Sequence, residues 1–278
     1  MDRNQELCGR YLVSLLSAVL KKTQPEEKPE KVSFEALFEM AEAHQVSVMA
    51  LAAVEKLTEK PEPDLFAKWQ DANGLHAFIN VAQILELDRL LKSFSSEGIR
   101  AVPLKGCLLK FIYPCTEYRQ MGDLDILIDE KDAEKARKVM ETLGYHTKCF
   151  EVGHHDYYQR DPLLIVELHR TLFDSKSDLL PFFKDIWDRV LPDDKSDHAF
   201  RLSDEDFYLF LITHLEKHFH NSGSGIKSIM DVAIFLNVYG DSLDWAYINR
   251  ELIKLGLVDF HETVKQLSMA WFQGEPYS

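Results

Sequence analysis

The chain has 278 residues, 46% of them hydrophobic and 11% aromatic, and its 46 acidic against 32 basic residues give a formal net charge of −14. This apolar content excludes a disordered chain, and no run approaches the roughly 18 consecutive apolar residues that a membrane-spanning helix needs. A field of this sign repels nucleic-acid backbones and anionic membranes, which argues against a broad nucleic-acid surface.

The cysteines and the N-terminal residues indicate the compartment. The four cysteines are scattered without a CxxC pair, at Cys8, Cys107, Cys115 and Cys149. Such usage is typical of a reducing environment with buried thiols. The first residues carry mixed charges and the apolar residues after them are interrupted, so we expect no signal peptide. These features predict a soluble, cytoplasmic protein.

The first hundred residues are expected to be helical. Apolar residues recur every three or four positions over residues 7–20, the spacing that gives a helix one apolar face. After a polar loop, Ser33 is a suitable N-cap for a second helix. Further helices are expected over residues 46–58 and 64–94, and Gly98 follows the last of them as a C-terminal signal.

From residue 99 the pattern alternates between strands and helices. Five short segments are expected to be strands: 99–104, 124–128, 145–151, 155–160 and 163–169. Helices are expected between them over residues 107–113 and 130–143. Beyond Ser203 the helical pattern returns, with helices expected over 207–219, over 226–238 and twice within 243–272.

The order of these elements predicts an α+β fold with three parts. An α/β core with a small mixed sheet is expected over residues 99–200. An N-terminal helical region over residues 1–98 and a C-terminal helical lobe over 201–278 are expected to flank it.

Asp123 and Asp125 open the apolar segment that ends at Ile128. Alternate residues of a strand project to the same face, so the two carboxylates are expected side by side while Leu124 and Ile126 point into the core. Neighbouring carboxylates repel each other unless a cation lies between them, and Mg²⁺ takes such ligands together with substrate phosphates. The alternative is a solvated acidic strand end.

Two further segments favour metal and phosphate chemistry. Lys105 and Gly106 lie where a strand leads into a helix, and there backbone N–H groups and a lysine can hold phosphate. A glycine turn beside a surface lysine is the alternative. Glu167 and His169 share one face of an otherwise apolar strand, where a glutamate needs a partner such as a metal. An edge strand with one wet face is the alternative for this pair.

These motifs together resemble the nucleotidyltransferase fold, the superfamily of DNA polymerase β-like and aminoglycoside-modifying enzymes. The resemblance is closest to a family of bacterial nucleotidyltransferase-like proteins and runs from about residue 86 to residue 239. The matching motifs are Leu104-Lys105-Gly106, Tyr113-Pro114, Arg119, Gly122-Asp123-Leu124-Asp125, Glu167-Leu168-His169, His214 and a helix with Asp231. Lys-Gly stands here where the wider superfamily has Gly-Ser.

The resemblance implies a metal-dependent nucleotidyltransferase that moves a nucleoside monophosphate from an NTP to a hydroxyl acceptor, expected to be a small molecule, with release of pyrophosphate. Its catalytic residues would be Asp123, Asp125 and Glu167, which would hold two Mg²⁺ or Mn²⁺ ions. The triphosphate would be bound by Lys105, Gly106, Arg119 and Lys227. His169 and His214 are expected to contact substrate.

Several residues have alternative interpretations. Arg119 could simply tether the acidic strand. His214 and His218 have the four-residue spacing of two zinc ligands on a helix, but neither an H-E-x-x-H motif nor a nearby cysteine accompanies them. His154 and His155 are expected to point to opposite faces of a strand, so at most one could face the site.

Three other functions are compatible with the same motifs. The first is a catalytically inactive member of the fold that binds a nucleotide or a partner protein. The second is a toxin-like enzyme that nucleotidylates tRNA or a protein, which would need a basic patch that the sequence does not offer. The third is a metal-dependent phosphohydrolase, which usually needs a histidine-rich ligand set.

Overall fold

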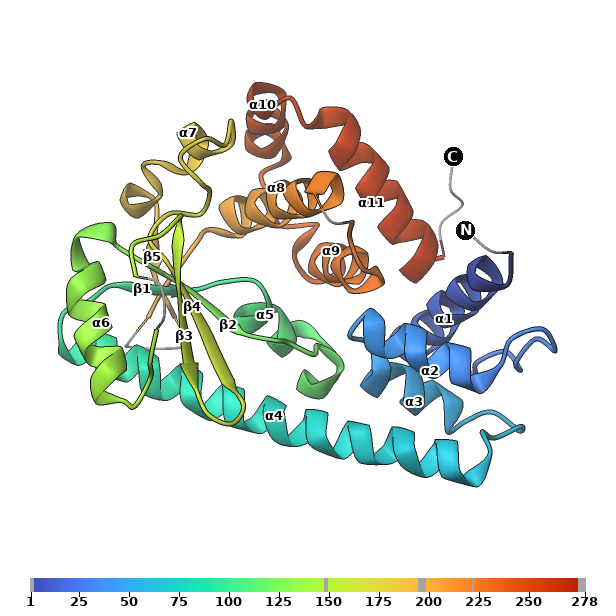
Figure 1. Cartoon of the computed structure of the whole chain (residues 1–278). Coiled ribbons are helices and arrows are strands. Elements are labelled where there is room, and N and C mark those ends of the chain that lie inside the picture. Colours follow the sequence, from blue (N-terminus) through green and yellow to red (C-terminus); the bar gives the residue numbers. More distant parts are fainter. Residues whose placement is uncertain (1–2, 148–149, 195–198, 222, 275–278) are drawn as a thin grey trace.

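The computed structural model describes residues 3–147, 150–194, 199–221 and 223–274. A small β-sheet lies between helices of the N-terminal and C-terminal thirds of the chain, and one long helix runs along the edge of the molecule (Figure 1). No helix in these ranges is long and apolar enough to cross a bilayer.

Four helices form the N-terminal part, as expected. They are α1 (Arg3–Lys21), α2 (Phe34–Ala43), α3 (Ser47–Val54) and α4 (Pro63–Ser96). Ser33 is the N-cap of α2, because its Oγ accepts a hydrogen bond from the backbone N of Ala36 at 3.1 Å. The 34-residue α4 extends from beneath the other three helices to the sheet (Figure 1).

The sheet is mixed, in the order β1-β2-β4-β3. Its strands are β1 (Ala101–Pro103), β2 (Leu124–Ile128), β3 (His155–Arg160) and β4 (Leu164–His169). The central pair β2 and β4 is parallel, and the two outer pairings are antiparallel. This arrangement confirms the predicted α+β fold with a small mixed sheet.

The strand expected over residues 145–151 was a wrong prediction. His146 makes only an isolated bridge with Gln159 of the edge strand β3. Residues 148–149 lie outside the described ranges. Beyond them, Glu151 has a φ of 57° and its backbone N bonds to the Asp156 carboxylate, so the chain turns instead of extending the sheet.

Short helices connect the strands. The segment after β1 forms α5 (Gly106–Leu109) and the 3₁₀ helix η1 (Lys110–Ile112), followed by η2 (Thr116–Tyr118). The helix expected over 130–143 begins as η3 (Glu130–Asp132) and continues as α6 (Ala133–Thr142). The sequence did not predict the elements after β4, which are α7 (Leu180–Phe183), η4 (Ile186–Asp188) and the hairpin of β5 (Leu191–Pro192) and β6 (Phe200–Arg201).

The C-terminal part contains the four expected helices, α8 (Asp204–Asn221), α9 (Ile226–Tyr239), α10 (Trp245–Leu255) and α11 (Val258–Phe272). Ser203 caps α8, because its Oγ accepts a hydrogen bond from the backbone N of Asp206. The last helix, α11, packs against both α9 and α1, so the first and the last helix of the molecule are in contact (Figure 1).

The two faces of the sheet belong to different hydrophobic clusters. Leu124, Ile126 and Ile128 of β2 pack with α4 and α6. Leu127, on the opposite face, joins a larger cluster that includes residues of α1–α3 and α8–α11. Asp125 lies two residues before Leu127 in β2, so its side chain projects from the same face of the sheet, toward the C-terminal helices. The division into three parts at residues 98 and 200 stays a prediction.

Candidate active site

The parallel pairing of β2 and β4 places the predicted acidic residues together. Asp125 is the register partner of Glu167, so their side chains project from adjacent strands toward the same side. Asp123 lies two residues before Asp125, where the chain enters β2. All three line a cavity of about 390 Å³.

Most of the other predicted site residues line the same cavity. They come from the loop before α5, from the loop before β2, from α8 and from α9, and are Lys105, Gly106, Arg119, His214 and Lys227. His169 lies behind this lining and is buried. Its Nε2 is hydrogen-bonded to Asp125 Oδ1 at 2.8 Å, so it belongs to the site through Asp125.

The Asp125 carboxylate is buried and is hydrogen-bonded to two side chains, Lys105 and His169. Lys105 Nζ donates to its Oδ1 at 2.7 Å, and His169 Nε2 meets the same oxygen. Burial by itself would raise the pKa of Asp125, but Lys105 and His169 outweigh burial and lower that pKa well below its usual range. The carboxylate is therefore ionised and neutralised by the protein itself.

Asp123 and Glu167 are in the opposite electrostatic situation. Burial, followed by the charge of Asp125, raises the pKa of Asp123, and burial with the charges of both aspartates raises the pKa of Glu167. Asp123 makes no side-chain hydrogen bond or ion pair with any other described residue. The Glu167 carboxylate lies 3.6 Å from His169 Nε2 and 3.7 Å from His155 Nε2.

This donor set fits a divalent cation. Oxygen or nitrogen atoms of Asp125, Glu167 and His169 all lie within 4.8 Å of one another, and Asp123 faces the same cavity. Donor atoms that share an ion at bond lengths of about 2.1 Å are separated by roughly 3 Å, close to the distances seen here. A cation would also remove the repulsion that raises the pKa values of Asp123 and Glu167.

The Lys105-Gly106 pair has a constrained backbone. Lys105 has a φ of 43° and a ψ of −119°, a conformation that favours glycine. At Gly106, an added Cβ would overlap Met121 Sδ and approach Arg119 Nη1 at 3.2 Å. Lys105 therefore occupies a strained backbone position and places its ammonium group on Asp125.

Arg119 is held by Asp231 of α9. Its Nε and Nη2 donate to the two carboxylate oxygens at 2.7 and 2.8 Å, and its Nη1 donates to the carbonyl of Gln120 at 2.7 Å. Tyr113 Oη donates to the same aspartate at 2.6 Å. Arg119 thus connects the loop before β2 to α9, and a contact between Arg119 and phosphate stays a prediction.

Lys227 and His214 approach the cavity from the C-terminal helices. Burial, with the charge of Arg119, lowers the pKa of Lys227 to about 7, and its Nζ donates to Gln45 Oε1 and to the Gln120 carbonyl. Burial lowers the pKa of His214, whose Nε2 lies 3.0 Å from that of His218. No group of three metal-ligand side chains among the described residues includes these two histidines.

His154 and His155 were underestimated by the sequence analysis. Strand alternation does not apply to them, because β3 begins at His155 and His154 precedes it. Their rings lie 5.9 and 5.3 Å from that of His169, so both lie beside this histidine, and His155 also approaches Glu167. The repeated His-His beside the E-L-H strand was the only signal in the sequence for this cluster.

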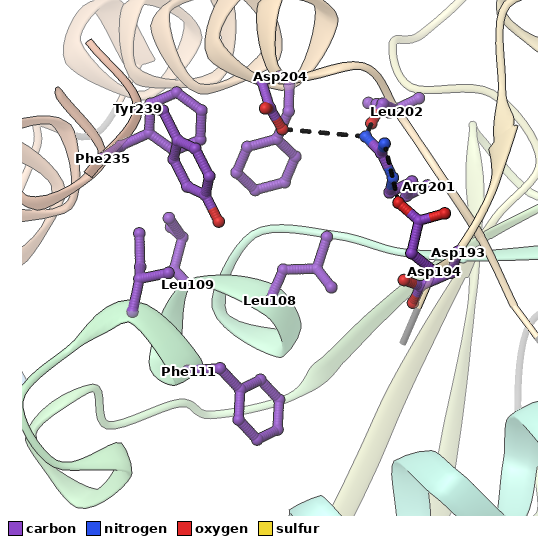
Figure 2. A pocket seen from close by; sticks show the side chains of 12 residues that line it. Leu108, Leu109, Phe111, Asp193, Asp194, Arg201, Leu202, Asp204, Phe235 and Tyr239 are labelled. Carbon is purple, nitrogen blue, oxygen red and sulfur yellow. Dashed lines mark hydrogen bonds and ion pairs between the residues drawn. The ribbon is translucent and has the colours of Figure 1, made fainter. Parts of the chain in front are cut away.

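A second cavity, of about 280 Å³, has a different character. Its walls are the apolar side chains of Leu108, Leu109, Phe235 and other residues, with Tyr239 projecting among them (Figure 2). Arg201 lies at one side, 3.5 Å from a carboxylate oxygen of Asp194 (Figure 2). Asp123, Asp125 and Glu167 do not line this cavity, so it is separate from the candidate active site.

A small mixed sheet lies between helices, and its acidic side chains face a cavity. This is the nucleotidyltransferase fold that the motifs implied. Residues 30–273 match a protein family described as uncharacterised nucleotidyltransferase, and the chain belongs to this family. No curated protein matches the chain in sequence.

Two solved structures are similar in shape. The antibiotic-resistance factor ANT(2'')-Ia, known from a solution structure, has a TM-score of 0.48 and 9% identity, over 66% of this chain and 98% of that one. An antigenic nucleotidyltransferase-like protein from Paracoccidioides brasiliensis has a TM-score of 0.39 and 14% identity, over 66% of this chain and 91% of that one. At these TM-scores, neither resemblance extends to activity.

Proposed function

We propose that the protein is a metal-dependent nucleotidyltransferase that moves a nucleoside monophosphate from an NTP to a hydroxyl group of a small molecule. The observation that supports this most is the pairing of Asp125 with Glu167 on adjacent parallel strands, with Asp123 beside them at one cavity. The negative net charge of −14 disfavours a nucleic-acid acceptor, and a cytoplasmic location is part of the proposal.

The side chains around the cavity can divide the work of the reaction. Asp123, Asp125 and Glu167, with His169 nearby, would hold Mg²⁺ or Mn²⁺ in a two-metal site, which would supply charge neutralisation at the reacting phosphate. Glu167 would join the site that activates the acceptor hydroxyl, and its carboxylate lines the cavity where it can accept the proton of that hydroxyl. The hydroxyl oxygen bonds to the α-phosphorus, and the bond to the bridging oxygen breaks to release pyrophosphate.

The lysines would complete the site when the triphosphate enters. In the free protein Lys105 is paired with Asp125, where it takes the place of a cation. A bound cation on Asp125 would release the Lys105 ammonium toward the β- and γ-phosphates. Lys227 lines the same cavity from α9 and would add the second positive charge.

The test is pyrophosphate release in the presence of each NTP, Mg²⁺ or Mn²⁺ and a metabolite extract. The wild-type chain is expected to release pyrophosphate and to form a nucleotidylated product detectable by mass spectrometry. Glu167→Gln is the matched control and is expected to be inactive. Turnover that is unaffected in Glu167→Gln, or unaffected by EDTA, would contradict the proposal.

A second candidate is a nucleotide-binding protein without turnover. The strained Lys105, paired with Asp125 at 2.7 Å where the superfamily has glycine, favours it. This candidate predicts metal-dependent NTP binding by calorimetry but no pyrophosphate with any acceptor. Pyrophosphate release by the wild-type chain excludes it.

A further inference from the structure

The outer face of α4 carries a row of exposed apolar side chains. Leu75, Phe78, Val81 and Leu85 are 52%, 62%, 52% and 67% exposed. They are spaced three, three and four residues apart, which places them along one side of the helix. We call these four residues the α4 stripe. Four large apolar side chains in a row are unusual on the surface of a monomer.

The stripe lies opposite the side of α4 that the fold uses. Trp69, Leu87 and Leu90 are buried on the inner side, where they pack with the rest of the chain. Figure 1 shows no other described segment outside α4 along this edge of the molecule. Folding of the single chain therefore leaves the stripe in water.

The two ends of the stripe carry opposite charges. Asp71 lies four residues before Leu75, and Arg89 lies four residues after Leu85, so both continue the same side of the helix. Arg89 is 47% exposed, with its Nη1 3.4 Å from a Glu86 carboxylate oxygen, and Asp71 is exposed as well. Both charged ends are therefore accessible to a partner.

We propose that the α4 stripe pairs with the α4 stripe of a second copy, antiparallel and around a two-fold axis level with residue 80. Position 80 is five residues from both Leu75 and Leu85 and nine residues from both Asp71 and Arg89. Each leucine then meets the other leucine of the second copy, and each Asp71 meets an Arg89. A two-fold interface must be complementary to itself in this way.

The charges of Asp71 and Arg89 favour the antiparallel pair of helices over a parallel pair. A parallel pair would bring Asp71 against Asp71 and Arg89 against Arg89, and like charges at an interface are repulsive. The α4 stripe has only four large apolar side chains, whereas a standard interface takes about 20–30 residues from each partner, so we expect a reversible dimer that dissociates on dilution.

The proposed interface lies directly behind a loop of the candidate active site. On its inner side, Asn80 donates to Thr116 Oγ1 at 3.0 Å, and Gln83 donates to the Met121 carbonyl at 3.1 Å. Met121 and the next residue lead to Asp123. Pairing would thus support the helix that positions this loop, although the proposal does not depend on the activity of the site.

Sedimentation of the full chain over a wide range of concentrations tests the proposal. The wild-type chain is expected to shift from monomer to dimer, and Leu85→Glu to weaken self-association at least tenfold. Ile253→Glu is the matched control, because Ile253 is 69% exposed on α10, and it is expected to dimerise like the wild type. Circular dichroism checks that both variants remain folded.

Charge exchange then tests the register. Asp71→Arg and Arg89→Asp are each expected to weaken the dimer, and the double variant to restore it, because the two-fold axis pairs the exchanged charges again. A wild-type chain that stays monomeric overturns the proposal. So does a dimer that is insensitive to Leu85→Glu, an open series of larger species, or a double variant that stays monomeric.

Discussion

Asp123 and Asp125 are two residues apart, but their surroundings act on their carboxylates in opposite directions. The pKa of Asp123 is raised by burial and by Asp125, whereas that of Asp125 is lowered because Lys105 and His169 outweigh burial. A raised carboxyl pKa means that the ionised form costs stability at neutral pH, and a lowered one means that ionisation contributes stability. The two aspartates should therefore differ in variants that remove only the charge.

We expect Asp123→Asn to keep or raise the free energy of unfolding at pH 7, and Asp125→Asn to lower it by about 3 kcal/mol, since Lys105 loses its buried partner. Both should abolish metal-dependent NTP binding. Urea denaturation without metal measures the first effect, and calorimetry measures the second. The difference should shrink as the pH falls far enough to protonate Asp125. Equal stabilities at pH 7 would show that Lys105 and His169 do not stabilise the Asp125 charge.

Lys105 combines a charge with a strained backbone, and two substitutions separate them. Lys105→Ala and Lys105→Gly both remove the ammonium, but only glycine accepts the φ of 43° without strain. We expect the glycine variant to be more stable than the alanine variant by about 1 kcal/mol. Both should bind NTP about 1–3 kcal/mol more weakly than the wild type. Glycine and alanine variants of equal stability would contradict the strain.

The side of the sheet on which a residue lies could be predicted from the sequence better than its contacts with distant residues. The convergence of Asp123, Asp125 and Glu167 on one cavity was predictable, because charges in apolar strands are conspicuous and strand alternation fixes their side. The pairing of Arg119 with Asp231 joins residues 112 positions apart, and no local pattern encodes such a contact. The ion pair of Lys105 with Asp125 was missed for the same reason.

At the scale of elements, α9 brings Lys227 to the cavity with a pKa lowered to about 7 by burial and by Arg119. At pH 8 most of this amine is neutral in the free protein. A bound triphosphate favours the protonated form, so NTP binding should take up a proton at pH 8, and the affinity should fall as the pH rises above 7.

Calorimetry of the metal-loaded protein in two buffers of different ionisation enthalpy measures this proton. Lys227→Met should abolish the uptake, whereas Lys138→Met, which removes an exposed lysine of α6, should leave it unchanged. Uptake that persists in Lys227→Met would assign the proton to another group.

Elements with a clear pattern of side chains were predicted well, whereas several of the shortest elements were missed. The bounds of β2 and β3 agree with the sequence analysis because each has several residues of clear alternation or apolar character. The elements α7, β5 and β6 have four residues or fewer, too few to establish a period. The expected strand at 145–151 fails because, among its described residues, the backbone pairs with β3 only at His146.

At the scale of the whole molecule, buried polar contacts join segments that the sequence analysis assigned to different parts. Asp231 of α9 binds Arg119 on the loop before β2 and also Tyr113 after η1. Its carboxylate is buried, as is the Arg119 side chain. This contact connects the C-terminal helices to the loop that leads into Asp123, so it should matter for both stability and the site.

We expect Asp231→Ala to lower the free energy of unfolding by about 3–5 kcal/mol, because it leaves the Arg119 guanidinium buried without its counter-charge. Asp241→Ala, at an exposed position just after α9, is the matched control and should change little. Adding Arg119→Met to Asp231→Ala should recover part of the loss, since it removes the unpaired charge. Urea denaturation followed by circular dichroism and by tryptophan fluorescence measures these differences. Losses that simply add in the double variant would mean that the two residues stabilise the molecule independently, and that the contact does not link the C-terminal helices to the active-site loop.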